Sequence, residues 1–100
     1  MDYYVYVLYS AKLGKRYIGL TNDLKRRLAQ HNSKGSKFTA TGQPWILMHY
    51  QAFIAKEDAQ REERFLKTGK GRDRLGYLLP STLDKIKRGD VAERSKAARC

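Results

Sequence analysis

Cysteine and histidine, which build most disulfides and zinc sites, are scarce in this chain of 100 residues. Its one cysteine, Cys100, cannot form an internal disulfide or assemble a thiolate metal cluster. The two histidines, His31 and His49, are too few and too far apart in sequence to make a zinc site without carboxylates. We therefore expect any metal site to use oxygen ligands. We also expect a reducing, cytoplasmic location with no disulfide-linked partner.

Long apolar runs and acidic residues are scarce as well. No apolar stretch is long enough to span a bilayer, and we see no signal-peptide pattern, so a membrane partner is not expected. Only 10 acidic residues accompany 21 lysines and arginines, which leaves a formal net charge of +11. Such a cationic surface attracts polyanions, and nucleic acid is the first partner to consider.

The segments with strand character come early in the chain. Tyrosine and valine are dense in residues 1–10, and residues 16–20 repeat the pattern after a glycine-containing turn. Together they predict a β-hairpin. Residues 45–53 are rich in apolar and aromatic side chains and predict a third strand, in which we interpret His49 as a core-lining residue.

Helical patterns follow the hairpin and the third strand. A helix is predicted to begin at Asp23, with Thr21 or Asn22 accepting its free amides. Residues 57–67 have apolar side chains spaced for one buried face, and residues 72–79 predict a short helix that ends before a proline.

The remaining segments are interpreted from composition. Residues 32–44 form a polar stretch that is long for a plain connection, so it is either a functional loop or a solvated linker. Gly69 and Gly71 are predicted to end the preceding helix in a basic turn, which is not a phosphate-binding P-loop because it lacks the hydroxyl residue and the preceding strand. We divide the chain into a domain of residues 1–80 and a basic, partly disordered extension of residues 81–100.

The first predicted helix carries the most interpretable polar residues. At about 100° per residue, Leu24 and Leu28 form its apolar stripe. Arg27 and His31 lie one turn apart along the border of that stripe, and Arg26 points away from it. One arginine and one histidine are thus placed where packing could aim them at a cleft.

Phosphodiester hydrolysis needs a carboxylate for a divalent ion, an arginine that neutralises developing charge, and a base that takes a proton from water. The chain offers strand tyrosines, the pair Arg27 and His31, and the helical glutamates Glu62 and Glu63. A tyrosine with a pKa near ~10 is a poor base alone, but surrounding cations and a nearby metal could lower that pKa enough for it to serve. The residues alone do not show that these groups meet.

Two short motifs and their spacing resemble a known family. The first is Tyr4-Val5-Tyr6 and the second Tyr17-Ile18-Gly19, and Arg27 and His31 follow at the family's spacing; residues 59–71 look like its glutamate helix, with Glu63 at the metal-ligand position and Glu62 as the alternative. Residues 1–79 thus resemble the GIY-YIG nuclease superfamily, particularly its small single-domain bacterial branch and the N-terminal domain of the excision-repair nuclease.

The resemblance implies an α+β fold, with a small three-stranded antiparallel sheet flanked by helices. It also implies an endonuclease that uses one Mg²⁺ or Mn²⁺ ion to cut one DNA strand, on branched or damaged DNA or in a repair setting. Tyr6 would be the general base or position the water, helped by Tyr17 and His31. Arg27 would stabilise the transition state, and Glu63 would bind the metal.

Two alternatives stay open beside this interpretation. The same fold could be a binding module with weak or no turnover, since fold alone does not fix function. RNA could take the place of DNA. In either case the phosphate contacts are expected from exposed basic residues, and binding should weaken steeply as salt rises. These candidates are Lys12, Lys15, Arg16, Lys25, Arg26, Lys34, Lys37, Lys70 and Arg72.

Overall fold

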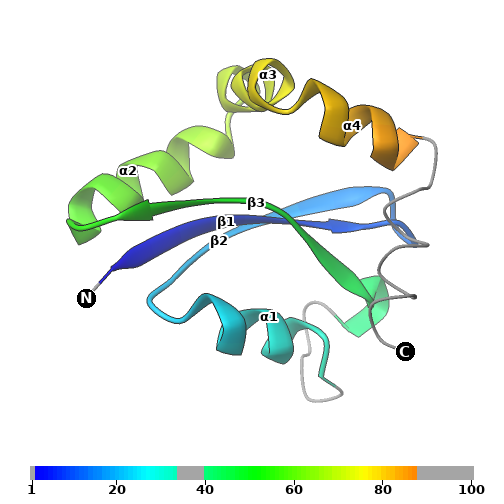
Figure 1. Cartoon of the computed structure of the whole chain (residues 1–100), viewed down its shortest axis with the longest axis horizontal. Coiled ribbons are helices and arrows are strands. Elements are labelled where there is room, and N and C mark those ends of the chain that lie inside the picture. Colours follow the sequence, from blue (N-terminus) through cyan, green and yellow to red (C-terminus); the bar gives the residue numbers. More distant parts are fainter. Residues whose placement is uncertain (1, 34–39, 88–100) are drawn as a thin grey trace.

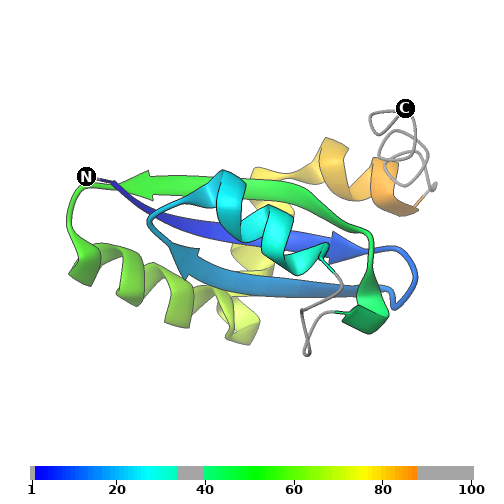
Figure 2. The ribbon, with the colours of Figure 1, turned by 90° about the horizontal axis from the view of Figure 1, so that it is seen from below.

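A three-stranded antiparallel sheet forms the middle layer of the protein (Figures 1 and 2). The computed structural model describes residues 2–33 and 40–87. Its strands are β1 (Tyr3–Ser10), β2 (Lys15–Thr21) and β3 (Trp45–Phe53), and their order across the sheet is β2-β1-β3. The predicted hairpin and third strand are confirmed, with β1 in the centre.

Helices cover both faces of this sheet. The helix α1 (Leu24–His31) lies on one face, below the sheet in Figure 1. Three others, α2 (Lys56–Leu66), α3 (Gly69–Leu78) and α4 (Pro80–Lys87), lie on the opposite face. A short 3₁₀ helix, η1 (Ala40–Gly42), precedes β3. The arrangement confirms the predicted α+β class.

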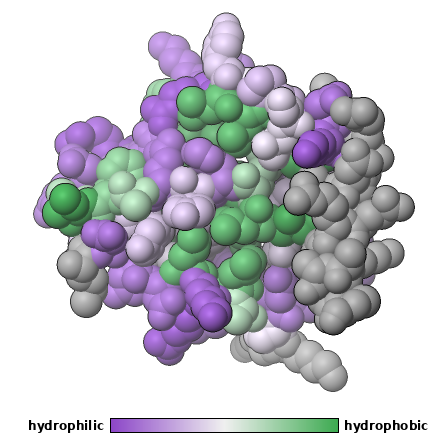
Figure 3. Space-filling view, in the orientation of Figure 1, coloured by the Kyte–Doolittle hydropathy of each residue, from purple (hydrophilic) through white to green (hydrophobic). Residues whose placement is uncertain are grey.

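Strand β1 supplies side chains to two separate cores because successive strand residues point to opposite faces. Val5 and Val7 pack with Ala59, Leu66 and Leu75 in an aliphatic core under α2 and α3. Tyr6 and Leu8 pack with Trp45, Leu24, Leu28 and Leu47 under α1. Hydrophobic residues gather over the middle of the molecule in Figure 3, with hydrophilic residues around them.

Helix α1 begins one residue later than predicted. Asp23 is its N-cap, and the Asp23 carboxylate accepts a hydrogen bond from the Arg26 backbone N–H at 3.1 Å. The Thr21 hydroxyl accepts the Asp23 backbone N–H at 3.0 Å instead of capping the helix directly. The carboxylate therefore fixes where the strand-to-helix unit turns.

The predicted basic turn at residues 69–71 is wrong, because these residues form the first turn of α3. The Thr68 hydroxyl accepts the Gly71 backbone N–H at 3.1 Å and caps the helix. A Cβ at Gly71 would overlap the Phe65 carbonyl oxygen and the Leu66 Cα. Gly71 therefore serves the close approach of α3 to α2 and does not break a helix.

Residues 81–87 of the expected extension belong to helix α4, which begins at Pro80. The rest of that extension, for which partial disorder is expected, lies outside the described residues, as do Lys34 and Lys37 of the long polar stretch. Across residues 2–33 and 40–87, no helix has the length and apolar composition needed to cross a membrane.

Candidate active site

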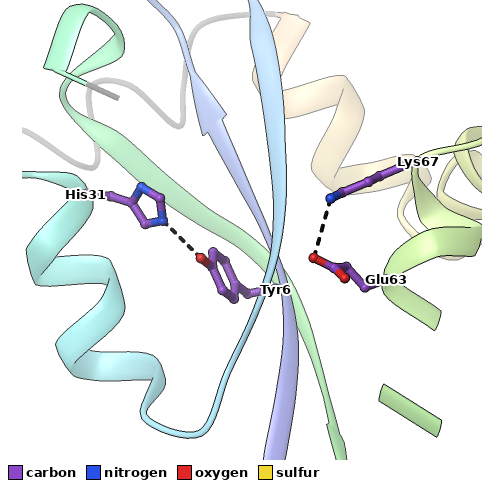
Figure 4. Close-up of polar contacts among 4 residues, drawn as sticks. All are labelled: Tyr6, His31, Glu63 and Lys67. Atoms are coloured by element: carbon purple, nitrogen blue, oxygen red, sulfur yellow. Dashed lines mark hydrogen bonds and ion pairs between the residues drawn. The ribbon is translucent and has the colours of Figure 1, made fainter. Parts of the chain in front are cut away.

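Tyr6 is the centre of the polar cluster on the α1 face. Its side chain is 2% exposed, and its hydroxyl lies 2.9 Å from Nε2 of His31 (Figure 4). His31 is in the last turn of α1 and is itself buried. Strand alternation aims Tyr6 at α1, and the helix brings His31 to meet it, so two residues 25 positions apart share a hydrogen bond.

Tyr17 reaches the same cluster from β2. Its ring is stacked on that of Tyr6, with the centroids 6.3 Å apart and the planes at 29°. It meets His31 edge-on at 4.7 Å and Trp45 at 6.2 Å. Because Tyr17 is 37% exposed, one side of this aromatic cluster faces solvent.

Gly19 makes room for the Tyr6 hydroxyl. It lies directly opposite Tyr6 in the β1–β2 pairing, and a Cβ there would overlap the Tyr6 hydroxyl and ring. The Tyr6 side chain thus lies across the backbone of edge strand β2. The sequence reasoning quoted Gly19 only as part of a motif, although a glycine inside a strand is a recognised signal for close approach.

Arg27 is exposed on α1, one turn before His31. Its positive charge still acts on the cluster, because it helps to lower the pKa of His31 and opposes the rise in the pKa of Tyr6. The sequence placed Arg27 at the border of the core. The structure puts it at the solvent side of the same cluster, where an anion could reach its guanidinium.

The protonation states follow from burial. Burial, with the neighbouring Tyr17 and Glu63, raises the pKa of Tyr6 to about 12, although Arg27 opposes the shift. Burial, and then Arg27, lowers the pKa of His31 below its usual 6.5. Among the protein's own groups, desolvation thus outweighs Arg27, and the lowering expected from cations together with a metal stays a prediction. Near neutral pH both groups are therefore neutral, and the Tyr6 hydroxyl donates the hydrogen bond when His31 carries its proton on Nδ1.

Glu63 approaches from the other face of the sheet, on α2 (Figure 4). Its carboxylate pairs with the ammonium of Lys67 at 3.4 Å and is partly exposed. Glu63 is also one of the groups that raise the pKa of Tyr6, so its charge is felt across β2. Its neighbour Glu62 is instead paired with Arg74 of α3 and is less exposed. This difference favours Glu63 over Glu62 as the carboxylate of the site.

The donor set fits one hard divalent cation held mainly by non-protein ligands. Within the described parts of the chain, no three His, Cys, Asp or Glu side chains gather closely enough to hold a metal. Glu63 offers carboxylate oxygens that already attract a cation, the ammonium of Lys67. Mg²⁺ is commonly bound by one or two carboxylates, with water and substrate phosphate completing its shell. The sequence reasoning missed Lys67, which its spacing of four residues from Glu63 could have indicated.

The predicted phosphate-binding residues are spread over both sides of the molecule. Those within the described residues are all exposed: Lys12, Lys15, Arg16, Lys25, Arg26, Lys70 and Arg72. His49 lies on β3, with its Nε2 buried and without a hydrogen-bond partner among the described residues. Burial and then Arg74 lower its pKa, as for a histidine that lines a core and stays neutral.

Comparison with known proteins shows the family to which this chain is similar. Residues 2–75 match the family model described as the GIY-YIG catalytic domain. A UPF0213 protein of Streptococcus pneumoniae is 47% identical over 76 residues, which are 75% of this chain and 76% of that protein. A UPF0213 protein of Bacillus pumilus is 36% identical over 85 residues, which are 84% and 86% of the two chains.

A solved structure shows the same fold. The solution NMR structure of a UPF0213 protein from Bacillus halodurans is 35% identical in sequence and superposes with a TM-score of 0.53. The match covers 85% of this chain and 96% of that one. The matching motifs, sheet and relatives lead to one conclusion: the chain belongs to the GIY-YIG family, a family of nucleases that generally depend on divalent metals.

Proposed function

We propose that this protein is a metal-dependent endonuclease that hydrolyses DNA phosphodiester bonds by nicking one strand, with branched or damaged DNA as candidate substrates, in the cytoplasm. The observation that carries the proposal is the 2.9 Å hydrogen bond between Tyr6 and His31, with Tyr17 stacked on Tyr6 and edge-on to His31, and with the charge of Glu63 acting across β2. This arrangement pairs a proton acceptor with a carboxylate on the two sides of one strand.

Proton transfer would run through Tyr6 to His31. A water molecule that attacks phosphorus gives its proton to the Tyr6 oxygen, while Tyr6 passes its own proton to Nε2 of His31. Because its pKa is raised, Tyr6 is better suited to relay a proton to His31 than to act as a base that is already deprotonated. Tyr17 holds the Tyr6 ring in place, and Gly19 leaves room for the Tyr6 hydroxyl at the sheet edge.

Arg27 and Glu63 would act on the phosphate from the two sides of that edge. Arg27 neutralises negative charge that develops on the phosphate oxygens. A divalent ion such as Mg²⁺ or Mn²⁺ would polarise the phosphate and stabilise the leaving oxygen. Glu63 would hold that ion, and Lys67 would leave the carboxylate and become free to meet a phosphate.

A second candidate is a binding module of the same fold with little or no turnover, on DNA or RNA. The protonated Tyr6 and the engagement of Glu63 by Lys67 would suit such a module equally well. The net charge of +11 supports nucleic-acid binding in both cases. Only a measurement of turnover separates the two functions.

Nicking of supercoiled plasmid with Mg²⁺ or Mn²⁺ is the test, with DNA binding measured in parallel. We compare the wild type with Glu63→Gln and with the matched change Glu62→Gln. Glu63→Gln should lower the nicking rate by about a hundredfold or more with binding retained, whereas Glu62→Gln should keep most of the rate. The reverse result would move the metal to Glu62. Binding without nicking by the wild type would replace the endonuclease with the binding module.

A further inference from the structure

A groove of about 1060 Å³ lies between β2 and the helices α3 and α4. In Figure 2, α2 lies along the β2 side of the sheet, whereas α4 lies on the β3 side. The first half of β2, from Lys15 to Ile18, lines the groove from the sheet. From the helical layer it is lined by α3 residues, namely Arg72, Asp73, Leu75, Gly76 and Tyr77.

The groove joins an apolar floor to a basic rim. Ile18, Leu66 and Leu75 belong to the aliphatic core or pack against it, so they form the recessed part. The charged lining residues are all exposed and lie at its margin. Among the described lining residues, four are basic and one is acidic: Lys15, Arg16, Lys67, Arg72 and Asp73.

An exposed aromatic ring stands at the same margin. Tyr77 lines the groove and is 87% exposed, so solvent reaches its ring as well as its hydroxyl. A flat, exposed ring beside cations is the usual platform on which a nucleobase stacks. The charge balance disfavours a basic protein surface and favours an anion with planar apolar parts.

The groove is continuous with the candidate active site around the edge of the sheet. Tyr17 belongs both to the aromatic cluster and to the groove lining. Lys67 lines the groove and pairs with Glu63. A strand whose phosphate lies at the β2 edge, between Tyr6 and Glu63, would therefore enter the groove with its next nucleotides.

We propose that this groove binds the nucleic-acid strand immediately beside the cleavage point. Phosphates lie against the basic rim at Arg16, Lys67 and Arg72, and a base lies over the apolar floor and stacks on Tyr77. The inference rests on the proposed function for the position of the cut, but it concerns binding and can be measured without cleavage.

Gly76 allows the groove to be blocked without harming the fold. It lines the groove from α3, and a Cβ there would meet no atom within 4 Å. Gly76→Leu should therefore place a side chain in the groove, and Gly76→Ala is the matched control that barely fills it. Both changes raise helix propensity, so both variants should melt at or above the wild-type temperature.

The readout is fluorescence anisotropy of a short labelled oligonucleotide, single-stranded or duplex, with the full chain and a chelator that prevents cleavage. Gly76→Leu should weaken binding about tenfold, as expected when a stacked base is excluded, and Gly76→Ala should stay within about twofold of wild type. Equal affinities of the two folded variants would overturn the proposal and leave the groove to another class of partner.

Charge removal gives an independent test. Arg72→Ala removes a rim cation, and Arg61→Ala removes an exposed cation of α2 outside the groove lining. Arg72→Ala should reduce the slope of log affinity against log salt by about one contact, or roughly 0.7 to 0.9, and Arg61→Ala should not. Identical slopes for the two variants would contradict the proposal.

The two proposals can fail separately. If Glu63→Gln nicks like wild type while Gly76→Leu weakens binding, the assigned catalytic carboxylate is wrong and the groove stands. If Glu63→Gln abolishes nicking while Gly76→Leu and Arg72→Ala bind like wild type, the nuclease stands and the strand takes another path.

Discussion

The two faces of the sheet differ in what they bury. Under α2 and α3, β1 contributes Val5 and Val7 to a core of aliphatic side chains. Under α1 the same strand contributes Tyr6, whose hydroxyl is buried with His31. Burying polar groups is unfavourable unless they are hydrogen-bonded, and here each group serves as the other's partner. The face under α2 and α3 therefore serves mainly stability. The face under α1 holds a polar site whose two groups are hydrogen-bonded to each other.

Edge strand β2 is where the two faces meet. Tyr6 lies across Gly19 from one side, and Glu63 acts from a helix on the other. A single face could not supply both, because α1 carries the arginine and histidine while α2 carries the carboxylate. Substitutions made on one face at a time should therefore separate effects on catalysis from effects on stability.

The largest expected effect is on catalysis. Tyr6→Phe removes the hydroxyl that contacts His31 and should lower the nicking rate by about 10²–10⁴-fold, with DNA binding retained. Val7→Ala, the neighbouring change on the other face, should instead lower the free energy of unfolding by about 2 kcal/mol. Nicking per folded molecule should then stay near wild type. Plasmid nicking and urea denaturation of both variants measure the contrast.

Two results would contradict this assignment of catalysis to one face and stability to the other. A Tyr6→Phe protein that nicks normally would make Tyr6 a packing residue. A Val7→Ala protein that is folded but does not nick would mean that the aliphatic core also sets the geometry of the site.

Two glycines provide the next test, because each permits a close approach on one face. An alanine Cβ at Gly19 would overlap Tyr6, whereas one at Gly71 would overlap the backbone of α2. Gly19→Ala should lower the nicking rate about tenfold or more by displacing the Tyr6 hydroxyl. Gly71→Ala should destabilise the fold by about 3 kcal/mol, because α3 must move away from α2, with nicking retained in the folded fraction.

Nicking and urea denaturation again distinguish the two variants. Gly76→Ala is the control, since its Cβ meets nothing within 4 Å and α3 should gain up to about 1 kcal/mol. Loss of nicking in Gly71→Ala at full folding, or normal nicking in Gly19→Ala, would contradict the assignment of the two glycines.

Gly71 also shows where prediction from sequence stopped. Local patterns placed all three strands, and the predicted third strand, residues 45–53, has the bounds of β3. The same local rules misread Gly71 as a helix breaker, because its reason lies in the distance to α2. Helix boundaries near residues 69–71 were thus decided by tertiary contact and by the Thr68 cap.

The candidate site, like the fold, could be predicted from sequence only in part. Helical spacing placed Arg27 and His31 on one side of their helix, and only the strand register could show that Tyr6 meets His31. The rise in the pKa of Tyr6 caused by burial had no signal in the sequence, since nearby cations are visible in a sequence and burial is not. The pairing of Glu62 with Arg74, which leaves Glu63 to face β2, joins two helices and has no local signal.

The smallest expected effect is a dependence on pH that separates the two histidines. His31 lies in the site and His49 on β3 beneath the other helical layer, and burial lowers the pKa of both below 6.5. An unfolded histidine binds a proton more readily than either does in the folded protein. Stability should therefore fall as pH drops below 6.5, whichever histidine titrates.

Nicking should follow His31 alone, because a protonated imidazole cannot accept the Tyr6 proton. The rate should be flat near pH 7 and fall about tenfold per pH unit below the pKa of His31, which NMR titration of the ring measures directly. His49→Gln should leave the midpoint of this rate profile unchanged, although it alters stability at low pH. A midpoint that follows His49, or a rate that ignores the protonation of His31, would remove His31 as the acceptor. Tyr6 would then have to pass its proton directly to solvent, which its burial opposes.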